Sequence, residues 1–373
     1  MSKSYYSLGL MSGTSMDGVD ASIIQSDGKS KYKAILDKYF EYPKDIFKDL
    51  TTLRDKIKSS KDLKRFEKQT KSIEKEITLF HAKAASKIIK KSKLNVDFIG
   101  FHGQTIFHNA EEQISRQIGD GELLSKLTKK KVVYNFRQND LKNGGQGAPL
   151  TPIFHSILVK QKKIPLPVVI LNIGGITNYT FIDEKGVSSG LDLGPGNCLI
   201  DQWVRLNSKK KYDENGRIAK SGKIKKIILN KALKNFKKKK LIKSSFDVKD
   251  FDISFVRGLS LEDGAATLTE YTSEILYEYL IDPEGGTWEN TIITGGGRKN
   301  KFLIKSIEDK IKSLGTLNSP LKLIDDYGVD GDFIESQAFA YLAIRSYLNL
   351  PISFPETTGV REPCNGGTIV KNF

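Results

Sequence analysis

A short turn near the start of the chain gathers glycines, hydroxyl groups and acids between two apolar runs. The stretch from Gly9 to Asp20 reads GLMSGTSMDGVD, and the apolar runs beside it predict the strands of a β-hairpin. Glycines allow a close approach to a ligand, hydroxyl groups can bind phosphate oxygens, and carboxylates can hold Mg²⁺ through water. The residues concerned are Gly13, Gly18, Thr14, Ser15, Asp17 and Asp20. For one such stretch alone, an ordinary Gly/Asp hairpin turn is the better explanation.

Three further glycine-bearing turns follow predicted strands. They are Gly174–Asn178 (GGITN), Gly194–Asn197 (GPGN) and Gly295–Gly297 (GGG). Backbone N–H groups in such turns can form anion-binding nests. Two hairpin turns far apart in the sequence, together with a strand–glycine–helix junction, make a more specific pattern than any single loop. Neither a P-loop motif nor a GxGxxG fingerprint is present, which argues against the two commonest nucleotide-binding folds.

The elements that must position these turns alternate between helix and strand. Apolar residues at helical spacing predict amphipathic helices over 44–58 and 66–88, joined by a turn at Ser59-Ser60. Apolar runs predict strands at 96–101, 132–136, 168–173, 178–182, 291–294 and 321–324, and helices from 300 and over 332–348. This alternation predicts the α/β class. The strand–turn–strand pattern near residue 13 recurs near residue 175, as if two halves share one plan. His81, in the second helix, is expected at the surface or its boundary.

Composition predicts a multidomain globular protein. The chain has 373 residues, of which 38% are hydrophobic and 28% charged, which suits two or three domains. No apolar run of about 18 residues predicts a membrane span, and no apolar signal core opens the sequence. Its two cysteines, Cys198 and Cys364, cannot build a disulfide framework. We therefore expect a cytoplasmic protein.

The formal net charge of +16 raises the possibility of nucleic-acid binding. The excess consists mainly of scattered lysines, in runs such as Lys129–Lys131, Lys209–Lys211 and Lys237–Lys240, without interleaved aromatic residues. Arginine, the better reader of bases, is sparse. Nonspecific polyanion binding at low salt is compatible with this pattern, whereas sequence-specific recognition of nucleic acid is not expected.

The combination of turns resembles the actin/Hsp70/sugar-kinase superfamily. In that superfamily, two ribonuclease-H-like domains each contribute a phosphate hairpin, a glycine-rich junction holds adenosine, and the active site is an interdomain cleft. Six segments, in order along nearly the whole chain, resemble one family within it, the anhydro-N-acetylmuramic acid kinases. They are Met11–Asp20, Phe101–Thr105, Gly144–Leu150, Asn172–Ile176, Asp192–Asn197 and Glu335–Ala340.

The resemblance implies an ATP- and Mg²⁺-dependent kinase of cell-wall recycling. Such enzymes open the ring of 1,6-anhydro-N-acetylmuramic acid with water and phosphorylate O6, and their members form homodimers. Asp192 matches the catalytic base that takes a proton from the attacking water. Residues in segments that match the ATP site are Gly13, Thr14, Ser15, Met16, Asp17, Gly18, Val19, Asp20, Gly174, Gly175, Gly295, Gly296 and Gly297, with Asp17 and Asp20 as candidate Mg²⁺ ligands through water. Residues in segments that line the sugar pocket are Gln104, Thr105, Arg137, Asp140 and Glu335.

Several of these residues have structural explanations as well. Asp192 can cap the turn that follows it, and Arg137 can pair with Asp140. Glu335 opens the last predicted helix, where an acid favours the helix dipole whatever its function. His102 and His108 lack a third His or Cys ligand nearby, so hydrogen bonding is favoured over zinc. Cys198 is expected in the core.

Two features depart from the family pattern. Many members carry threonine directly after the catalytic aspartate, whereas this chain has Leu193. That change removes a possible hydroxyl contact with the substrate and leaves the carboxylate. The lysine-rich segment from Asn207 to Asp252 matches least well and is interpreted as a surface excursion.

The predicted domains are 1–136, with the tail of about 350–373 returning to it, and 137–349. Two rival functions remain. An ordinary hydroxyl kinase would phosphorylate the free sugar at least as well as the anhydro form. An ATP-driven binding protein like actin or Hsp70 would show ATPase activity without sugar. It would also have actin- or Hsp70-like length or an added peptide-binding domain, which we do not expect here.

Overall fold

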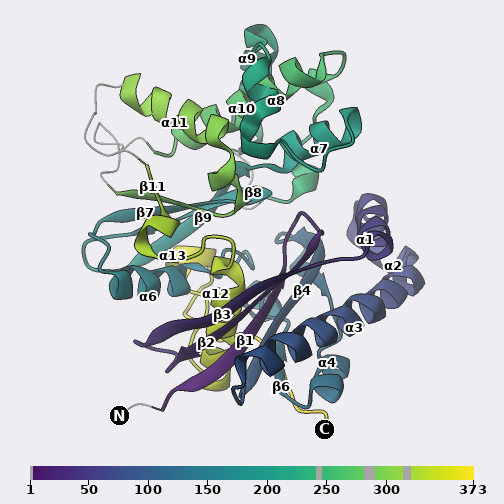
Figure 1. Cartoon of the computed structure of the whole chain (residues 1–373), viewed down its shortest axis with the longest axis vertical. Helices are drawn as coiled ribbons and strands as arrows, with labels where there is room; N and C mark the ends of the chain where they lie inside the picture. The colour runs from purple at the N-terminus through teal and green to yellow at the C-terminus, as the bar shows by residue number, and fades with distance from the viewer. Residues whose placement is uncertain (1–2, 241–245, 281–289, 314–320) are drawn as a thin grey trace. The chain divides into compact units, whose positions relative to one another are not determined.

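Two units, each built on its own β-sheet, make up the protein (Figure 1). The computed structural model describes residues 3–240, 246–280, 290–313 and 321–373. The first unit comprises Met1–Ile164 and Asp332–Phe373, and the second Pro165–Gly331. Among the described residues, no helix is long and apolar enough to cross a membrane.

The first unit combines a sheet with helices on both faces. Its strands are β1 (Tyr5–Ser12), β2 (Gly18–Ser26), β3 (Tyr32–Glu41), β4 (Phe98–Asn109), β5 (Ile114–Ile118), β6 (Lys131–Tyr134) and β12 (Thr368–Val370). Its helices are α1 (Lys44–Lys56), α2 (Ser60–Arg65), α3 (Glu67–Ser92), α4 (Gly121–Thr128), α5 (Gln138–Lys142), α6 (Pro152–Lys162), α12 (Ile334–Tyr347) and α13 (Pro355–Thr358). The sheet order is β12-β6-β4-β1-β2-β3, with β5 paired to β4.

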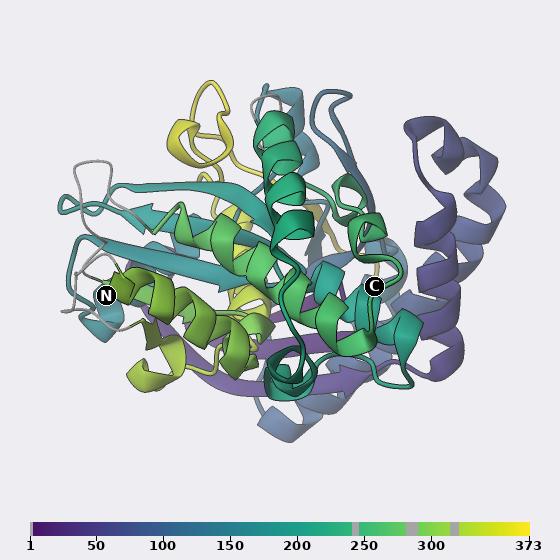
Figure 2. The ribbon, with the colours of Figure 1, turned by 90° about the horizontal axis from the view of Figure 1, so that it is seen from above.

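The second unit repeats this strand plan. Its strands are β7 (Val168–Ile173), β8 (Ile176–Ile182), β9 (Ser188–Pro195), β10 (Thr291–Thr294) and β11 (Lys322–Leu323), in the order β11-β10-β7-β8-β9. Its helices are α7 (Cys198–Asn207), α8 (Arg217–Ser221), α9 (Lys226–Lys240), α10 (Leu261–Tyr277) and α11 (Lys301–Ser313), with 3₁₀ turns η1 (Glu214–Gly216), η2 (Val248–Asp250), η3 (Ser254–Val256), η4 (Gly296–Lys299) and η5 (Ile324–Tyr327). Helices α10 and α11 pack side by side (Figures 1 and 2).

Both sheets share one connectivity. In each, the first three strands form an antiparallel meander, a later strand (β4 or β10) pairs in parallel with the first, and one more strand (β6 or β11) pairs in parallel with that one. In the first sheet, β5 adds antiparallel to β4. Strands β1, β2, β3, β4 and β6 therefore correspond in order to β7, β8, β9, β10 and β11. The prediction of an α/β protein with two halves on one plan is confirmed.

Helix α12 approaches the first sheet closely because two strand positions lack a side chain. It packs on β1, β2 and β4 while α3 packs on the same sheet from the other face (Figure 1). A Cβ built on Gly9 would lie 1.8 Å from the carbonyl oxygen of Ser336, and one on Gly100 would lie 2.2 Å from that of Phe339. Backbone-to-backbone packing at this distance is open only to glycine.

The predicted elements are largely confirmed, with specific exceptions. The strand expected at 96–101 is β4, which continues to Asn109 where it pairs with β5, so the segment Phe101–Thr105 lies within a strand. The turn expected at Ser59-Ser60 is the start of α2, where Ser59 and Asp62 form a capping box. The expectation for His81 was wrong: its side chain is fully buried and packs against Phe101.

The units found here divide the chain differently from the expected boundaries. Segments 137–164 and 332–349 group with the first unit, because α12 covers the first sheet and α6 contacts both α12 and β3. The tail does join the first sheet, where β12 pairs antiparallel with β6.

We predict that Gly9→Ala destabilises the protein by about 1–3 kcal/mol, the usual cost of overpacking. The added methyl would overlap the backbone of α12 at Ser336 and Ala340. The measurement is the free energy of unfolding by urea. Gly13→Ala is the matched control, because a Cβ at Gly13 meets nothing within 4 Å. Equal stability of the two variants would contradict the close packing of α12.

Candidate functional site

The turn between β1 and β2 is held from both sides by the first unit. Met16 is buried in the core and donates its N–H to the carbonyl of Gly13 at 3.1 Å. Arg54 donates to the carbonyl of Thr14 at 3.1 Å. Thr14 and Ser15 are exposed, whereas Gly18 and Val19 are buried. Of the predicted ATP segment, the exposed tip is therefore available to a ligand, and the flanking residues hold the tip in place.

The buried hydroxyl of Ser12 lies beneath this turn. The Ser12 hydroxyl lies 2.7 Å from Gln104 Oε1 and 2.9 Å from the carbonyl of Gly18, and the Tyr42 hydroxyl donates to it at 3.2 Å. Gln104 Nε2 donates to the carbonyl of Gly13 at 3.1 Å. Gln104, predicted to line the sugar pocket, thus has both polar atoms bonded within the protein. Sequence reasoning missed Ser12, which lies in the Met11–Asp20 segment but was not singled out, and Tyr42, which lies in none of the six segments.

The acids of the turn share one electrostatic environment. Ser15 donates its hydroxyl to Asp17 Oδ1 at 2.5 Å, and Asp20 pairs across the sheet with Met11. Burial, and then the charges of Asp17 and Asp20, raise the pKa of Tyr39. Within the described ranges, no group of three or more His, Cys, Asp or Glu residues is arranged to hold a metal ion. Two carboxylates without a third ligand suit Mg²⁺ that keeps several waters and also binds phosphates.

Arg137 connects three segments of the first unit. Its Nε and Nη2 lie 3.2 and 3.0 Å from His102 Nε2, and its Nη1 donates to the carbonyl of Gly147 at 2.8 Å. Burial and then Arg137 lower the pKa of His102, so the imidazole is neutral and accepts from the guanidinium. The hydrogen bonding predicted for His102 is present.

The remaining predicted sugar residues lie in the same unit. Asp140 is 1% exposed and accepts from Gly147 N and from the Thr358 hydroxyl, both at 2.6 Å, so it fixes the loop before α6. Glu335 occupies the first turn of α12. Burial raises the pKa of Glu335, while the charge of Arg137 lowers it, so these two side chains interact. Thr105 accepts from Gln117 Nε2 at 3.0 Å.

In the second unit, strand pairing places Asp192 in one row with two asparagines. Asp192 pairs with Asn178, and Asn178 pairs with Asn172. Asp192 is 7% exposed and accepts a hydrogen bond from the backbone N–H of Phe246 at 3.1 Å. Phe246 belongs to the lysine-rich segment, of which residues 241–245 lie outside the described part. That segment therefore includes buried residues and is not wholly a surface excursion.

Leu193 faces away from Asp192. It is fully buried in the core formed by β7, β9, α10 and α11. Its side chain packs in that core, whereas the Asp192 carboxylate accepts from the backbone of Phe246, which belongs to a different core cluster. The expected loss of a substrate contact at this position therefore has no support in the structure. Cys198 is buried in a neighbouring core cluster, as predicted.

Two of the glycine turns are bonded to each other. Gly196 N and Cys198 N donate to the carbonyl of Gly175 at 2.9 and 3.2 Å, and Asn197 N donates to the carbonyl of Gly174 at 2.8 Å. The N–H groups of the Gly196–Cys198 segment are thus used within the protein. The anion-binding hypothesis is correspondingly weaker for Gly194–Asn197 than for the Gly174-Gly175 turn.

The Gly295–Gly297 turn has one open position. A Cβ on Gly295 would lie 2.4 Å from Asn172 Oδ1, and one on Gly297 would lie 2.2 Å from Ile173 Cγ2. A Cβ on Gly296 would meet nothing within 4 Å. The turn is fixed by Arg298, which donates to Asp325 at 2.6 and 3.0 Å. Both Arg298 and Asp325 were missed, since a charged pair 27 residues apart has no local signal.

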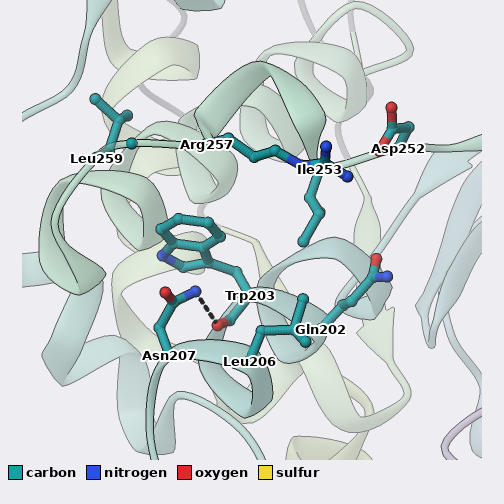
Figure 3. Close-up of a pocket in the computed structure, with 9 residues that line it drawn as sticks. Gln202, Trp203, Leu206, Asn207, Asp252, Ile253, Arg257 and Leu259 are labelled. Atoms are coloured by element: carbon teal, nitrogen blue, oxygen red, sulfur yellow. Dashed lines mark hydrogen bonds between the residues drawn. The ribbon is translucent and has the colours of Figure 1, made fainter.

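The second unit also carries a surface hollow of about 450 Å³ (Figure 3). Its walls include Trp203 and Leu206 of α7 and Arg257 of the segment after η3. Trp203 donates its indole N–H to the carbonyl of Leu261 at 2.9 Å. None of the predicted site residues lines this hollow, so its size alone does not mark it as the reaction site.

Comparison with known proteins agrees with the motif pattern. A family model described as anhydro-N-acetylmuramic acid kinase matches residues 5–372. A relative of that name from Pelagibacter ubique is 56% identical, with 100% of each chain covered. Relatives of the same name from Zymomonas mobilis and Agrobacterium fabrum are 39% and 37% identical, covering 97% and 98% of this chain and 98% of each of theirs. The chain belongs to the anhydro-N-acetylmuramic acid kinase family.

Proposed function

We propose that this protein uses ATP to phosphorylate O6 of 1,6-anhydro-N-acetylmuramic acid while water opens the anhydro ring. The product is N-acetylmuramic acid 6-phosphate, which places the enzyme in cell-wall recycling. Membership of the kinase family supports the reaction class. The observation that carries the proposal is Asp192, a nearly buried carboxylate within β9, in one register row with two amides. We also expect a homodimer in the cytoplasm.

Asp192 is assigned as the general base. It takes a proton from the water whose oxygen attacks C1, and the C1–O6 bond breaks as O6 attacks the γ-phosphorus of ATP. The bond from that phosphorus to ADP then breaks. Because O6 leaves toward phosphorus, a second carboxylic acid that protonates the leaving group is not required, in contrast to a glycosidase.

Phosphoryl transfer itself needs mainly positioning and charge neutralisation. We assign the β1–β2 tip and the Gly174-Gly175 turn to the phosphates, and the Gly295–Gly297 turn to adenosine. Asp17 and Asp20 would hold Mg²⁺ through water, and the ion would neutralise phosphate charge. Arg137 and Glu335, which interact with each other, are assigned to the sugar, with Thr105 and Asp140; Gln104 would act by holding the turn at Gly13.

The experiment that tests the function compares two sugars. With ATP and Mg²⁺, we expect a 6-phosphorylated product from 1,6-anhydro-N-acetylmuramic acid at a higher kcat/KM than from free N-acetylmuramic acid, measured by mass spectrometry. ATP hydrolysis without sugar should be slow. Better turnover of the free sugar would instead indicate an ordinary hydroxyl kinase.

We predict that Asp192→Asn lowers kcat by about 10²-fold or more, the usual scale of a general base. The amide keeps the size of the side chain but cannot accept the proton, so ATP affinity and melting temperature should stay near the wild-type values. Asp309→Asn, on the exposed face of α11, is the control for loss of a carboxylate. Near-normal turnover by Asp192→Asn would show that another group is the base.

We predict that Gly13→Val weakens ATP binding about tenfold or more, equivalent to about 1.4 kcal/mol. The valine side chain meets no protein atom near its Cβ, so a loss of affinity would come from the ligand. Isothermal titration of an ATP analogue measures it. Gly18→Ala is the contrasting variant: its Cβ would lie 2.5 Å from the carbonyl of Phe40, so it should lower stability. Unchanged affinity of Gly13→Val would remove the β1–β2 tip from the phosphate site.

A further inference from the structure

One row of polar residues crosses four strands of the second sheet. Thr294 of β10 pairs with Asn172 of β7, which pairs with Asn178 of β8, which pairs with Asp192 of β9. Residues directly opposite one another share a face of the sheet, with Cβ atoms about 4.5–5.5 Å apart. The apolar core containing Leu171, Tyr179, Leu191 and Leu193 lies on the other face. The row is therefore a polar stripe on one face, with the proposed base at its end.

The first two members of the row, Thr294 and Asn172, already have contacts within the protein. The Thr294 hydroxyl lies 3.4 Å from Asn172 Oδ1, and a Cβ on Gly295 would lie only 2.4 Å from that same oxygen. Asn172 thus braces the Gly295–Gly297 turn. Its role is accounted for by contacts within the protein.

Asn178 differs from its neighbours in the row. Its Oδ1 atom is buried and has no hydrogen-bond partner among the described residues. A buried acceptor without a donor is costly, about 1–3 kcal/mol, and native proteins usually satisfy it with ordered water or a ligand. The cross-strand neighbour, Asp192, cannot supply the donor when ionised, because a carboxylate only accepts.

We propose that Asn178 Oδ1 and the Asp192 carboxylate together bind the attacking water. This inference rests on the proposed function. A water molecule has two O–H groups, so it can donate one to each of two neighbouring acceptors. Its lone pairs then face away from both acceptors and toward C1 of the sugar. Asn178 is a positioning residue for the hydration step.

The assignment leaves the chemistry balanced. The proton on the Asp192 side passes to the carboxylate as the water oxygen bonds to C1. The O–H on the Asn178 side remains on the new hydroxyl at C1, and Asn178 neither gains nor loses a proton. The electron pair of the broken C1–O6 bond goes to O6, which bonds to phosphorus. An amide is suited to this role because it accepts a hydrogen bond without competing for the proton.

The test compares Asn178→Leu with Asn178→Asp in the full-length enzyme. Leucine keeps the approximate size but has no acceptor, so kcat with the anhydro sugar should fall about 10- to 100-fold, while KM for ATP changes less than about twofold. Aspartate restores an acceptor oxygen and should recover a substantial part of the lost kcat. A structural role alone would not produce this split or this recovery.

The control is Tyr179→Phe, the next position on β8. Tyr179 belongs to the apolar core on the opposite face, so removing its hydroxyl should leave kcat near wild type. If Asn178→Leu turns over like wild type, or if leucine and aspartate variants are equally impaired, the inference is wrong although the kinase function stands. If the wild-type enzyme makes no 6-phosphate from the anhydro sugar, the proposed function fails and this inference fails with it.

Discussion

The pairing register of β7, β8 and β9 is the constraint on which the proposed chemistry depends. A one-residue slip of a strand would turn every side chain to the other face. Here the register keeps Asp192 and Asn178 together and directs Leu191 and Leu193 into the core. The bulge between Thr177 and Asn178 lies at the same end of the sheet, where bulges commonly redirect side chains. Hydrophobic burial on one face thus fixes the geometry of the polar residues on the other.

The same sheet plan serves a different purpose in the first unit. There the first hairpin ends in an exposed tip, Thr14 and Ser15, supported by the buried Ser12–Gln104–Tyr42 hydrogen bonds. Helix α12 covers that sheet and also carries Glu335 in its first turn. Burial raises the pKa of Glu335, against the lowering effect of the charge of Arg137. The packing of α12 against Gly9 therefore positions a proposed sugar residue relative to the strand that leads into the phosphate turn.

Much of this arrangement could be predicted from sequence, for physical reasons that differ by residue. Strands such as β7 and β10 are largely apolar and are followed directly by glycines, so local pattern suffices to find them. The duplicated plan follows from the two glycine-tipped hairpins. His81 was misplaced because helical periodicity around it does not reveal that α3 packs against Phe101 of β4.

Other residues could not be predicted from local pattern, because their roles come from contacts distant in sequence. Gln104 supports a turn 91 residues away, and Arg298 pairs with an acid on another segment. Asn178 was part of a recognised glycine turn, yet only strand register pairs it with Asp192. The unit boundaries were missed for the same reason: α12 lies far along the chain from the sheet that it covers.

In the proposed mechanism, one reaction couples hydration at C1 to phosphorylation at O6. The most direct measurement is a brief incubation in ¹⁸O-water with ATP, Mg²⁺ and 1,6-anhydro-N-acetylmuramic acid, followed by mass spectrometry before anomeric exchange. We predict a 6-phosphate that carries one ¹⁸O, at C1. A phosphorylated product without ¹⁸O, or with the anhydro ring intact, would contradict the coupled mechanism.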